Sequence, residues 1–338
     1  MITSRNLTTI EDNQKTRVRH IALCDYALVT LVFSLHSRYT MWLVADRRLS
    51  YGANIPPIDD AVKILNLETT DGVGLLAYAG LGATSQGTQP SEWMKGVLRG
   101  RGGLTFEQAL GVLSSAANRE LPRHLIGFPK GASRSHSIIS PAFIRGVGAR
   151  LYSIDTVIEN RKTYHRYTSH QHIDRPGSPC LRLAAGGTGA GHLNKIARQD
   201  VRWRRDLLGL LNAHDHGKIS DYLIADRLAK ISYETHQAVP ATVGPRCIVV
   251  WRRRQDMRQP TSGGGHQFYT GTDRDKISDA IPTITNGIDI QSIAGIFMDH
   301  FMEKISEHGM KLTDSELDTA KLNRLLAKLP SEPDEKLR

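Results

Sequence analysis

Two neighbouring runs decide the fold: Thr30-Leu-Val-Phe-Ser-Leu-His36 and Met41-Trp-Leu-Val-Ala-Asp46. Both are rich in the aliphatic, aromatic and β-branched residues that strands favour, and the polar segment 37–40 between them suits a hairpin. A threonine opens the first run, an aspartate ends the second sixteen residues later, and Lys63 follows. The spacing predicts that neighbouring strands bring an acid and an amine beside the Thr30 hydroxyl.

A hydroxyl with an amine and a carboxylate beside it suggests nucleophilic chemistry. A threonine hydroxyl at its ordinary pKa is a poor nucleophile and needs an adjacent base. If the chain were cut before Thr30, the freed α-amine of that residue could be the base. Each of the three residues also has an ordinary structural explanation. Thr30 could be a simple strand residue, Asp46 an ion-pair partner of Arg47 and Arg48, and Lys63 a solvated surface residue.

The remaining chain alternates between groups of strands and groups of helices. Further strands are expected at 72–79, 135–146, 150–155, 164–174, 180–185 and 246–251, and helices at 90–98, 104–121, 192–212 and 220–236. Pro122 is expected to stop the second helix. This order favours an α+β fold of two stacked sheets between helix layers over regular βαβ alternation.

The domain prediction has four parts. Residues 1–20 form a flexible N-terminal segment, and residues 21–254 form the main domain. Residues 255–274, rich in Gly, Pro and Ser, form a linker, and residues 275–338 form a C-terminal helical extension. A chain of 338 residues with 40% hydrophobic content is long enough for such a large domain with an appendage.

The composition limits the classes of binding partner and the cellular compartment that we expect. Cys24, Cys180 and Cys247 show no CxxC spacing, which indicates reduced thiols and a cytoplasmic protein. No apolar run approaches the roughly 18 residues of a membrane span, and the N-terminus lacks a signal-peptide core, so neither membrane insertion nor export is expected. The net charge of +10 comes without a nucleic-acid-binding motif, so a solvated basic face is favoured over nucleic-acid binding.

Two other patterns in the sequence could form ligand sites. The run Gly186-Gly-Thr-Gly-Ala-Gly191 could cradle a phosphate but lacks the Lys-Ser/Thr of a P-loop, so a tight turn is favoured. Five histidines could suggest a metal site, but they have no Cys or Glu at ligand spacing (His165, His170, His172, His214, His216). We therefore expect no metal and no cofactor. Cys24 lies too far from Asp46 to replace Thr30 as the nucleophile.

Residues 28–252 resemble a proteasome β-type subunit, a member of the N-terminal-nucleophile hydrolase superfamily. The resemblance rests on the order and spacing of five features: the Thr30–Asp46 interval, Lys63-Ile64, Ala79-Gly80, Arg150-Leu-Tyr-Ser-Ile-Asp155 and Gly187-Thr188-Gly189. It implies a four-layer αββα sandwich and a threonine-type endopeptidase. It also implies assembly into a homo-oligomeric ring or barrel that acts on a peptide or protein substrate.

The resemblance implies a role for each matching residue. Thr30 would attack the peptide carbonyl, Lys63 would lower the pKa of its hydroxyl, and Asp46 would hold Lys63. The backbone N–H of Gly80 would stabilise the oxyanion, Ser50 would contact the substrate backbone, and Thr188 would support the nucleophile. The extension 275–338 would offer a docking place for a regulatory partner.

Three departures from the family pattern keep other functions open. Val29 precedes Thr30 where the family has glycine, the segment 232–244 lacks the family's late Asp and Ser, and the tail after Trp251 is longer. Within that segment, Glu234 and Thr242 are only loose substitutes. The first alternative is an inactive scaffold or regulatory protein with the same fold. The second is an amidase or acylase that acts on a small amide.

Overall fold

The structure is a computed structural model that describes residues 8–10, 30–49, 57–80, 89–124, 136–159, 162–170, 182–255, 266–270, 281–308 and 318–329. Its strands form two sheets. The first has the order β1-β9-β2-β3-β10-β11, built from β1 (Thr8–Ile10), β9 (Arg182–Gly186), β2 (Val32–His36), β3 (Thr40–Asp46), β10 (Arg246–Arg253) and β11 (His266–Thr270). The second has the order β13-β12-β4-β5-β6-β7-β8, built from β13 (Ile288–Asp289), β12 (Thr283–Thr285), β4 (Ile64–Glu68), β5 (Gly72–Ala79), β6 (Ser137–Ile144), β7 (Gly148–Glu159) and β8 (Lys162–His170).

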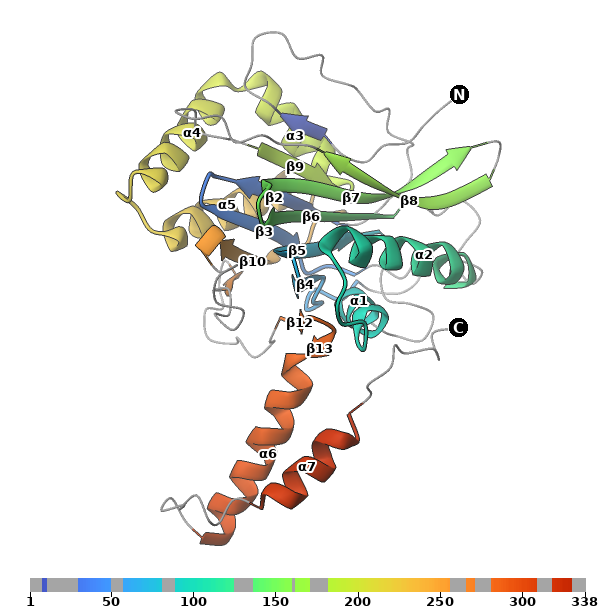
Figure 1. Cartoon of the computed structure of the whole chain (residues 1–338). Helices are drawn as coiled ribbons and strands as arrows, with labels where there is room; N and C mark the ends of the chain where they lie inside the picture. The colour runs from blue at the N-terminus through green and yellow to red at the C-terminus, as the bar shows by residue number, and fades with distance from the viewer. Residues whose placement is uncertain are drawn as a thin grey trace.

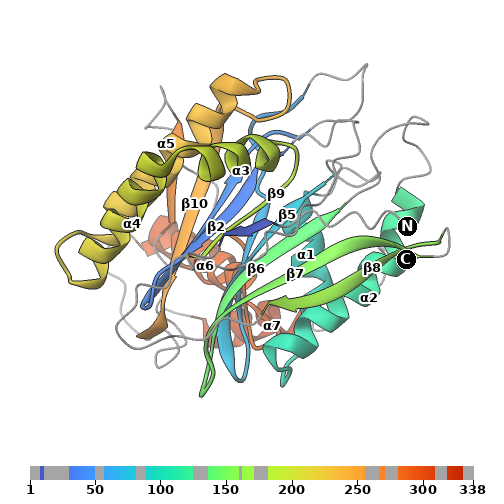
Figure 2. The same ribbon diagram turned by 90° about the horizontal axis from the view of Figure 1, so that it is seen from above.

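Helices cover the outer faces of both sheets. The second sheet is covered by α1 (Pro90–Leu98) and α2 (Phe106–His124), and the first by α3 (Gly189–Gln199), α4 (Val201–Asp215) and α5 (Asp221–Ala238). Figure 2 shows these two helix groups on opposite sides of the strands. The α+β class with two sheets is therefore confirmed.

The alternation of side chains along each strand builds three apolar layers. Along β5, Leu76 and Tyr78 face α1 and α2, whereas Leu75 and Ala77 face the other sheet. Successive side chains of a strand point to opposite faces, so a strand covered on both sides must be apolar throughout. All eight residues of β5 are buried, as this rule requires.

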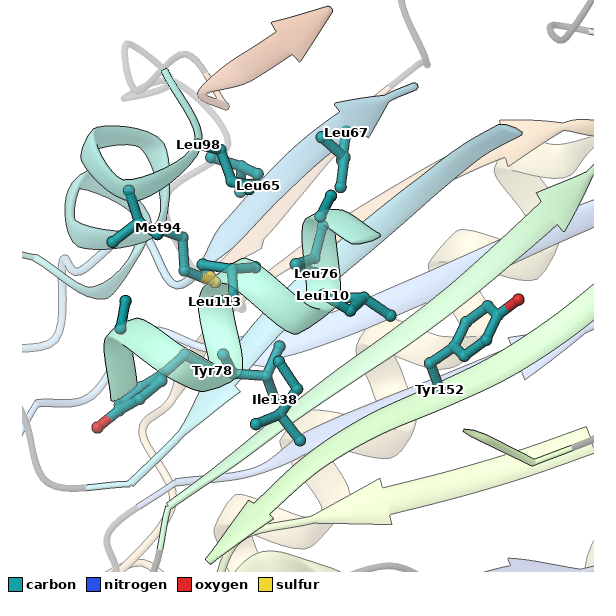
Figure 3. Close-up of a cluster of buried hydrophobic side chains, with 14 of the residues drawn as sticks. Leu65, Leu67, Leu76, Tyr78, Met94, Leu98, Leu110, Leu113, Ile138 and Tyr152 are labelled. Atoms are coloured by element: carbon teal, nitrogen blue, oxygen red, sulfur yellow. The ribbon is translucent and has the colours of Figure 1, made fainter. Parts of the chain in front are cut away.

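The layer beneath α1 and α2 is closely packed. Met94 and Leu98 of α1 and Leu110 and Leu113 of α2 point toward strand side chains such as Leu76 (Figure 3). Phe106 reaches so deep that a Cβ on Gly74 would lie 2.3 Å from its ring. Position 74 therefore holds a glycine because the α2 aromatic ring occupies the space of a side chain.

Several predicted boundaries shift. Helix α2 does not stop at Pro122 but continues to His124. A proline removes one backbone hydrogen bond, and so close to the end of a helix this loss affects few residues. The predicted helix 192–212 is two helices, because the Asp200 side chain accepts a hydrogen bond from the Trp203 N–H and starts α4 as its N-cap. Residues expected to form a linker include β11, which pairs antiparallel with β10.

The C-terminal segment begins inside the second sheet. β12 pairs in parallel with β4, and its Thr285 hydroxyl donates to the Glu68 carboxylate. The same carboxylate receives the Arg252 guanidinium of β10 at 2.6 Å, and Arg252 is fully buried. Arg252 therefore ties the two sheets together and does not belong to a basic surface. After β13, α6 (Ile290–His308) and α7 (Thr319–Ala327) extend away from the sheets (Figure 1).

Candidate functional site

Thr30, Asp46 and Lys63 meet at one end of the space between the sheets. Thr30 lies just before β2 and Asp46 ends β3, so both belong to the first sheet, while Lys63 precedes β4 of the second. The Lys63 Nζ donates to Thr30 Oγ1 at 2.5 Å and to Asp46 Oδ1 at 2.8 Å. The side chains of Lys63 and Asp46 are 1% and 0% exposed. The lysine thus bridges the two sheets through a buried hydroxyl–amine–carboxylate chain.

Burial and the ion pair act on Lys63 in opposite directions. Desolvation lowers the pKa of its amine, the Asp46 carboxylate raises it through charge and a hydrogen bond, and the net direction is downward. A buried ammonium is expensive unless paired, so the amine gives up its proton more readily than a solvated lysine. As the donor to Thr30 Oγ1, the Lys63 amine can stabilise negative charge that forms on that oxygen.

The turn after β9 packs closely against the backbone of Thr30 and is hydrogen-bonded to it. The Thr30 N–H points at Thr188 Oγ1 at 3.4 Å, and the Thr30 carbonyl accepts from the Gly189 N–H at 3.2 Å. Gly187 has a φ of +83°, and a Cβ there would lie 2.2 Å from the Thr30 carbonyl oxygen. Only glycine combines this backbone conformation with so close an approach. The glycine-rich run thus forms a tight turn against Thr30.

Backbone donors orient the Asp46 carboxylate. Its Oδ1 accepts from the Leu31 N–H at 2.9 Å, and its Oδ2 accepts from the N–H groups of Gly244 at 2.9 Å and Arg48 at 3.3 Å. These three bonds fix the carboxylate through both of its oxygens. The acid therefore stays in place even when Lys63 moves or changes its charge.

A second ion pair holds the Gly244 loop against the site. Arg48 donates from Nε and from one terminal nitrogen to the Asp59 carboxylate, at 2.7 and 2.8 Å, and also donates to the Pro240 carbonyl at 2.5 Å. A Cβ on Gly244 would lie 2.9 Å from both Arg48 and Asp59. We call this group the Arg48–Asp59 clamp. It fixes the loop whose N–H reaches Asp46.

The other predicted site residues lie in different settings. Gly80 is buried just after β5, and a Cβ there would lie 2.6 Å from His136 Nδ1. Ser50 lies outside the described residues. Glu234 is an exposed partner of Arg227, and the Thr242 hydroxyl donates to the Val239 carbonyl, so neither substitutes for the late Asp or Ser.

Sequence reasoning missed the residues that support Asp46 from a distance. Gly244 lies 198 positions from Asp46, and nothing local marks its N–H as a donor. Asp59 is an acidic residue that follows the Ala45-Asp-Arg-Arg48 run, but no sequence pattern predicts that its side chain pairs with Arg48. Arg47 instead donates to the Ala61 carbonyl at 3.3 Å and so steadies the segment that leads to Lys63.

The described residues offer no alternative centre of metal or thiol chemistry. Among them, no group of three or more His, Cys, Asp or Glu residues is placed to hold a metal ion. Burial raises the pKa of the Cys247 thiol to about 12, which keeps it protonated. Within the same ranges, none of the helices combines the length and apolarity that a membrane crossing needs.

Fold and site together define an α+β protein of two sheets with a buried threonine–lysine–aspartate group between them. No family model and no curated protein matches the chain. Among solved structures, the chain is similar to the helical assembly of the Anbu complex from Pseudomonas aeruginosa. That match has 15% identity and a TM-score of 0.47 and covers 90% of this chain and 99% of the other. It is also similar to Anbu (ancestral beta-subunit) from Yersinia bercovieri, with 13% identity and a TM-score of 0.44 over 72% and 88% of the two chains.

These findings correct the family assignment made from sequence. The two solved structures named above are Anbu proteins and not proteasome β-type subunits, and no family model supports the N-terminal-nucleophile superfamily. The assignment of the chain to that family is therefore wrong. Its cause is physical: a threonine, an aspartate and a lysine at strand-dictated spacing describe a local geometry, and that geometry does not identify one family.

Proposed function

We propose that the chain hydrolyses amide bonds as a threonine peptidase, with the Thr30 hydroxyl as nucleophile once the Val29–Thr30 bond is cut. One observation carries the proposal: Lys63 Nζ lies 2.5 Å from Thr30 Oγ1 and 2.8 Å from Asp46 Oδ1 in a buried site. The proposal includes a four-layer αββα order, in which the nucleophile lies between the sheets at their end.

The freed Thr30 would supply both the base, which is its α-amine, and the nucleophile, which is its Oγ1 hydroxyl. Its α-amine takes the proton from Oγ1, and Oγ1 attacks the substrate carbonyl carbon to form a tetrahedral intermediate. Collapse of the intermediate gives an ester of Thr30, and the amine returns the proton to the leaving nitrogen. Water then hydrolyses the ester. The position of Thr188 Oγ1, 3.4 Å from the Thr30 nitrogen, supports its role as a partner of the freed amine.

Lys63 and Asp46 would tune the hydroxyl without joining the bond changes. As an ammonium, Lys63 stabilises the alkoxide that forms on Oγ1, and Asp46 keeps the ammonium in place. Gly80 remains our choice for the oxyanion donor, and Ser50 for a contact with the substrate backbone. A buried glycine at the end of β5 supports the first of these roles.

A second candidate function is a non-catalytic scaffold that assembles with copies of itself. In the intact chain the Thr30 nitrogen is an amide, its side chain is buried, and a β-branched Val29 precedes it. An amide nitrogen is no base, so the group is latent for as long as residues 1–29 stay attached. On this alternative, the ion pair of Lys63 and Asp46 only joins the two sheets.

Hydrolysis assays on variants separate these functions. Purified chain is incubated with fluorogenic peptide amides and with small acyl amides, beside Thr30→Ala, Thr30→Ser and Lys63→Arg. Our proposal expects turnover that Thr30→Ala abolishes and Thr30→Ser retains in part, because serine keeps the hydroxyl. Turnover of small amides alone would favour an acylase. Equal turnover by wild type and Thr30→Ala would contradict the mechanism.

A further inference from the structure

Helix α6 carries large apolar side chains that water reaches. Their exposed fractions are between 39% and 61%, in Ile290, Phe297, Met298, Phe301 and Met302. We call these five residues the α6 stripe. Scattered exposed apolar residues are ordinary, but a contiguous patch of this kind marks an interaction surface.

The α6 stripe points away from the rest of the described chain. At 100° per residue its members lie within an arc of about 140° on the helix. His300, on the opposite side, is buried, and Glu303 on that side pairs with Lys321 of α7 at 2.6 Å. Helix α7 therefore covers one side of α6, and the stripe lies on the exposed side. The two helices extend away from the sheets (Figure 1).

The charges beside the stripe narrow the class of partner. The stripe itself holds no charged residue, so a strongly acidic or basic partner would leave its own charges desolvated against it. The charged residues elsewhere on α6 include Asp299, Glu303 and Lys304. Helices that lie on membranes favour Lys and Arg on their polar face, and this face is mainly acidic. An apolar protein surface is the better match.

The stripe is complementary to itself when two copies of α6 run antiparallel. With the pair centred between Asp299 and His300, Met298 lies opposite Phe301 of the second copy. Phe297 then lies opposite Met302, and the small Ala294 lies opposite Ile305. Thioether sulfur and aromatic rings attract one another, and small residues facing large ones let two surfaces interdigitate.

The area of the stripe agrees with such a pair. A large apolar side chain offers on the order of 200 Å² when fully exposed, so five half-exposed ones offer about 500 Å² per copy. Two copies then bury about 1,000 Å², the lower bound for a specific protein interface. We propose that the α6 stripe is a twofold contact between two copies of this chain, with their α6 helices antiparallel. A twofold contact closes on itself and joins two subunits only.

Charge-reversal pairs test the contact in the full-length chain. One chain carries Met298→Glu with Phe301→Glu, and a second carries Met298→Lys with Phe301→Lys. In an antiparallel pair each double variant places like charges opposite one another, whereas their mixture places Glu opposite Lys. Val147→Glu, at an exposed apolar residue in the turn between β6 and β7, is the matched control. Circular dichroism checks the fold of each chain.

Particle mass by light scattering gives the outcome. We expect each double variant to have half the mass of the wild-type particle, the equimolar mixture to regain the wild-type mass, and Val147→Glu to match wild type. The proposal is overturned if the folded double variants keep the wild-type mass. It is also overturned if the mixture stays dissociated, or if wild type binds neutral phosphatidylcholine vesicles as a single chain. None of these readouts depends on Thr30.

Discussion

Removing the charge of Asp46 and removing the charge of Lys63 leave different buried groups without their ion-pair partner. Asp46→Asn leaves the Lys63 ammonium, at 1% exposure, without a counter-charge and with only neutral acceptors such as the Thr30 hydroxyl. Lys63→Met leaves the Asp46 carboxylate with three backbone N–H donors. We therefore expect the aspartate variant to lose far more stability, although both substitutions break the same contact.

The magnitudes follow from the contacts. An uncompensated buried charge costs about 3–5 kcal/mol, which is the expected loss for Asp46→Asn. Lys63→Met removes the charge-assisted bond to Asp46, worth about 1.5–3 kcal/mol, together with the bond to the Thr30 hydroxyl. The methionine regains part of this through apolar packing, so its net loss is about 1–2 kcal/mol. Urea unfolding at 25 °C and pH 7 measures both, with Lys230→Met, at an exposed ion pair, as a control within about 0.5 kcal/mol of wild type.

A loss for Lys63→Met that equals or exceeds the loss for Asp46→Asn would refute this reasoning. The pH dependence gives a second check. Burial lowers the pKa of folded Lys63 below its ordinary 10.5, so the unfolded chain binds more protons between those two values. Wild-type stability relative to Lys63→Met must then rise with pH across that window. A relative stability that falls there would show the opposite shift.

Three further predictions concern residues around the site and the helix layer. Although burial lowers it, the pKa of His214 rises to about 9 because the Asp215 carboxylate lies close by and the Asp221 carboxylate is hydrogen-bonded to the ring. Its stabilising charge is therefore fully present below pH 6.5 and lost as the pH passes 9. The difference in Tm between wild type and His214→Gln should shrink over that range, and a constant difference would contradict it. Gly187→Ala should cost well over 1 kcal/mol in urea unfolding. Gly146→Ala, with φ +74° and open space around it, should cost only about 1 kcal/mol, and similar losses would argue against contact with Thr30. Arg48→Ala should speed hydrogen exchange at the Gly244 amide, Arg48→Lys should do so less, and unchanged exchange would mean that the clamp does not hold the loop.

The sequence predicts best those features that depend on a single strand or helix. The strand expected at 72–79 and the helix expected at 90–98 are β5 and α1, with the same bounds in the structure. The spacing of Thr30, Asp46 and Lys63 predicted their meeting, because strand geometry and a hairpin leave little freedom over short intervals. Their catalytic roles stay a prediction.

Features that depend on distant contacts could not be predicted in this way. The parallel pairing of β12 with β4 joins residues 217 positions apart, and the Gly244–Asp46 bond joins residues 198 apart. Neither leaves a local pattern, because the sequence near each partner fits many environments. The break at Asp200 is different: an aspartate before Val-Arg-Trp203 is a usual N-cap signal, and the continuous apolar periodicity on both sides concealed it.

The most direct test of the central claim is the intact mass and N-terminal sequence of the purified protein. The account predicts a chain that begins at Thr30, with its α-amine free beside Thr188 and Lys63. A chain that retains residues 1–29 in a fully folded preparation would contradict it, because an acylated Thr30 nitrogen has no basic lone pair to activate the hydroxyl.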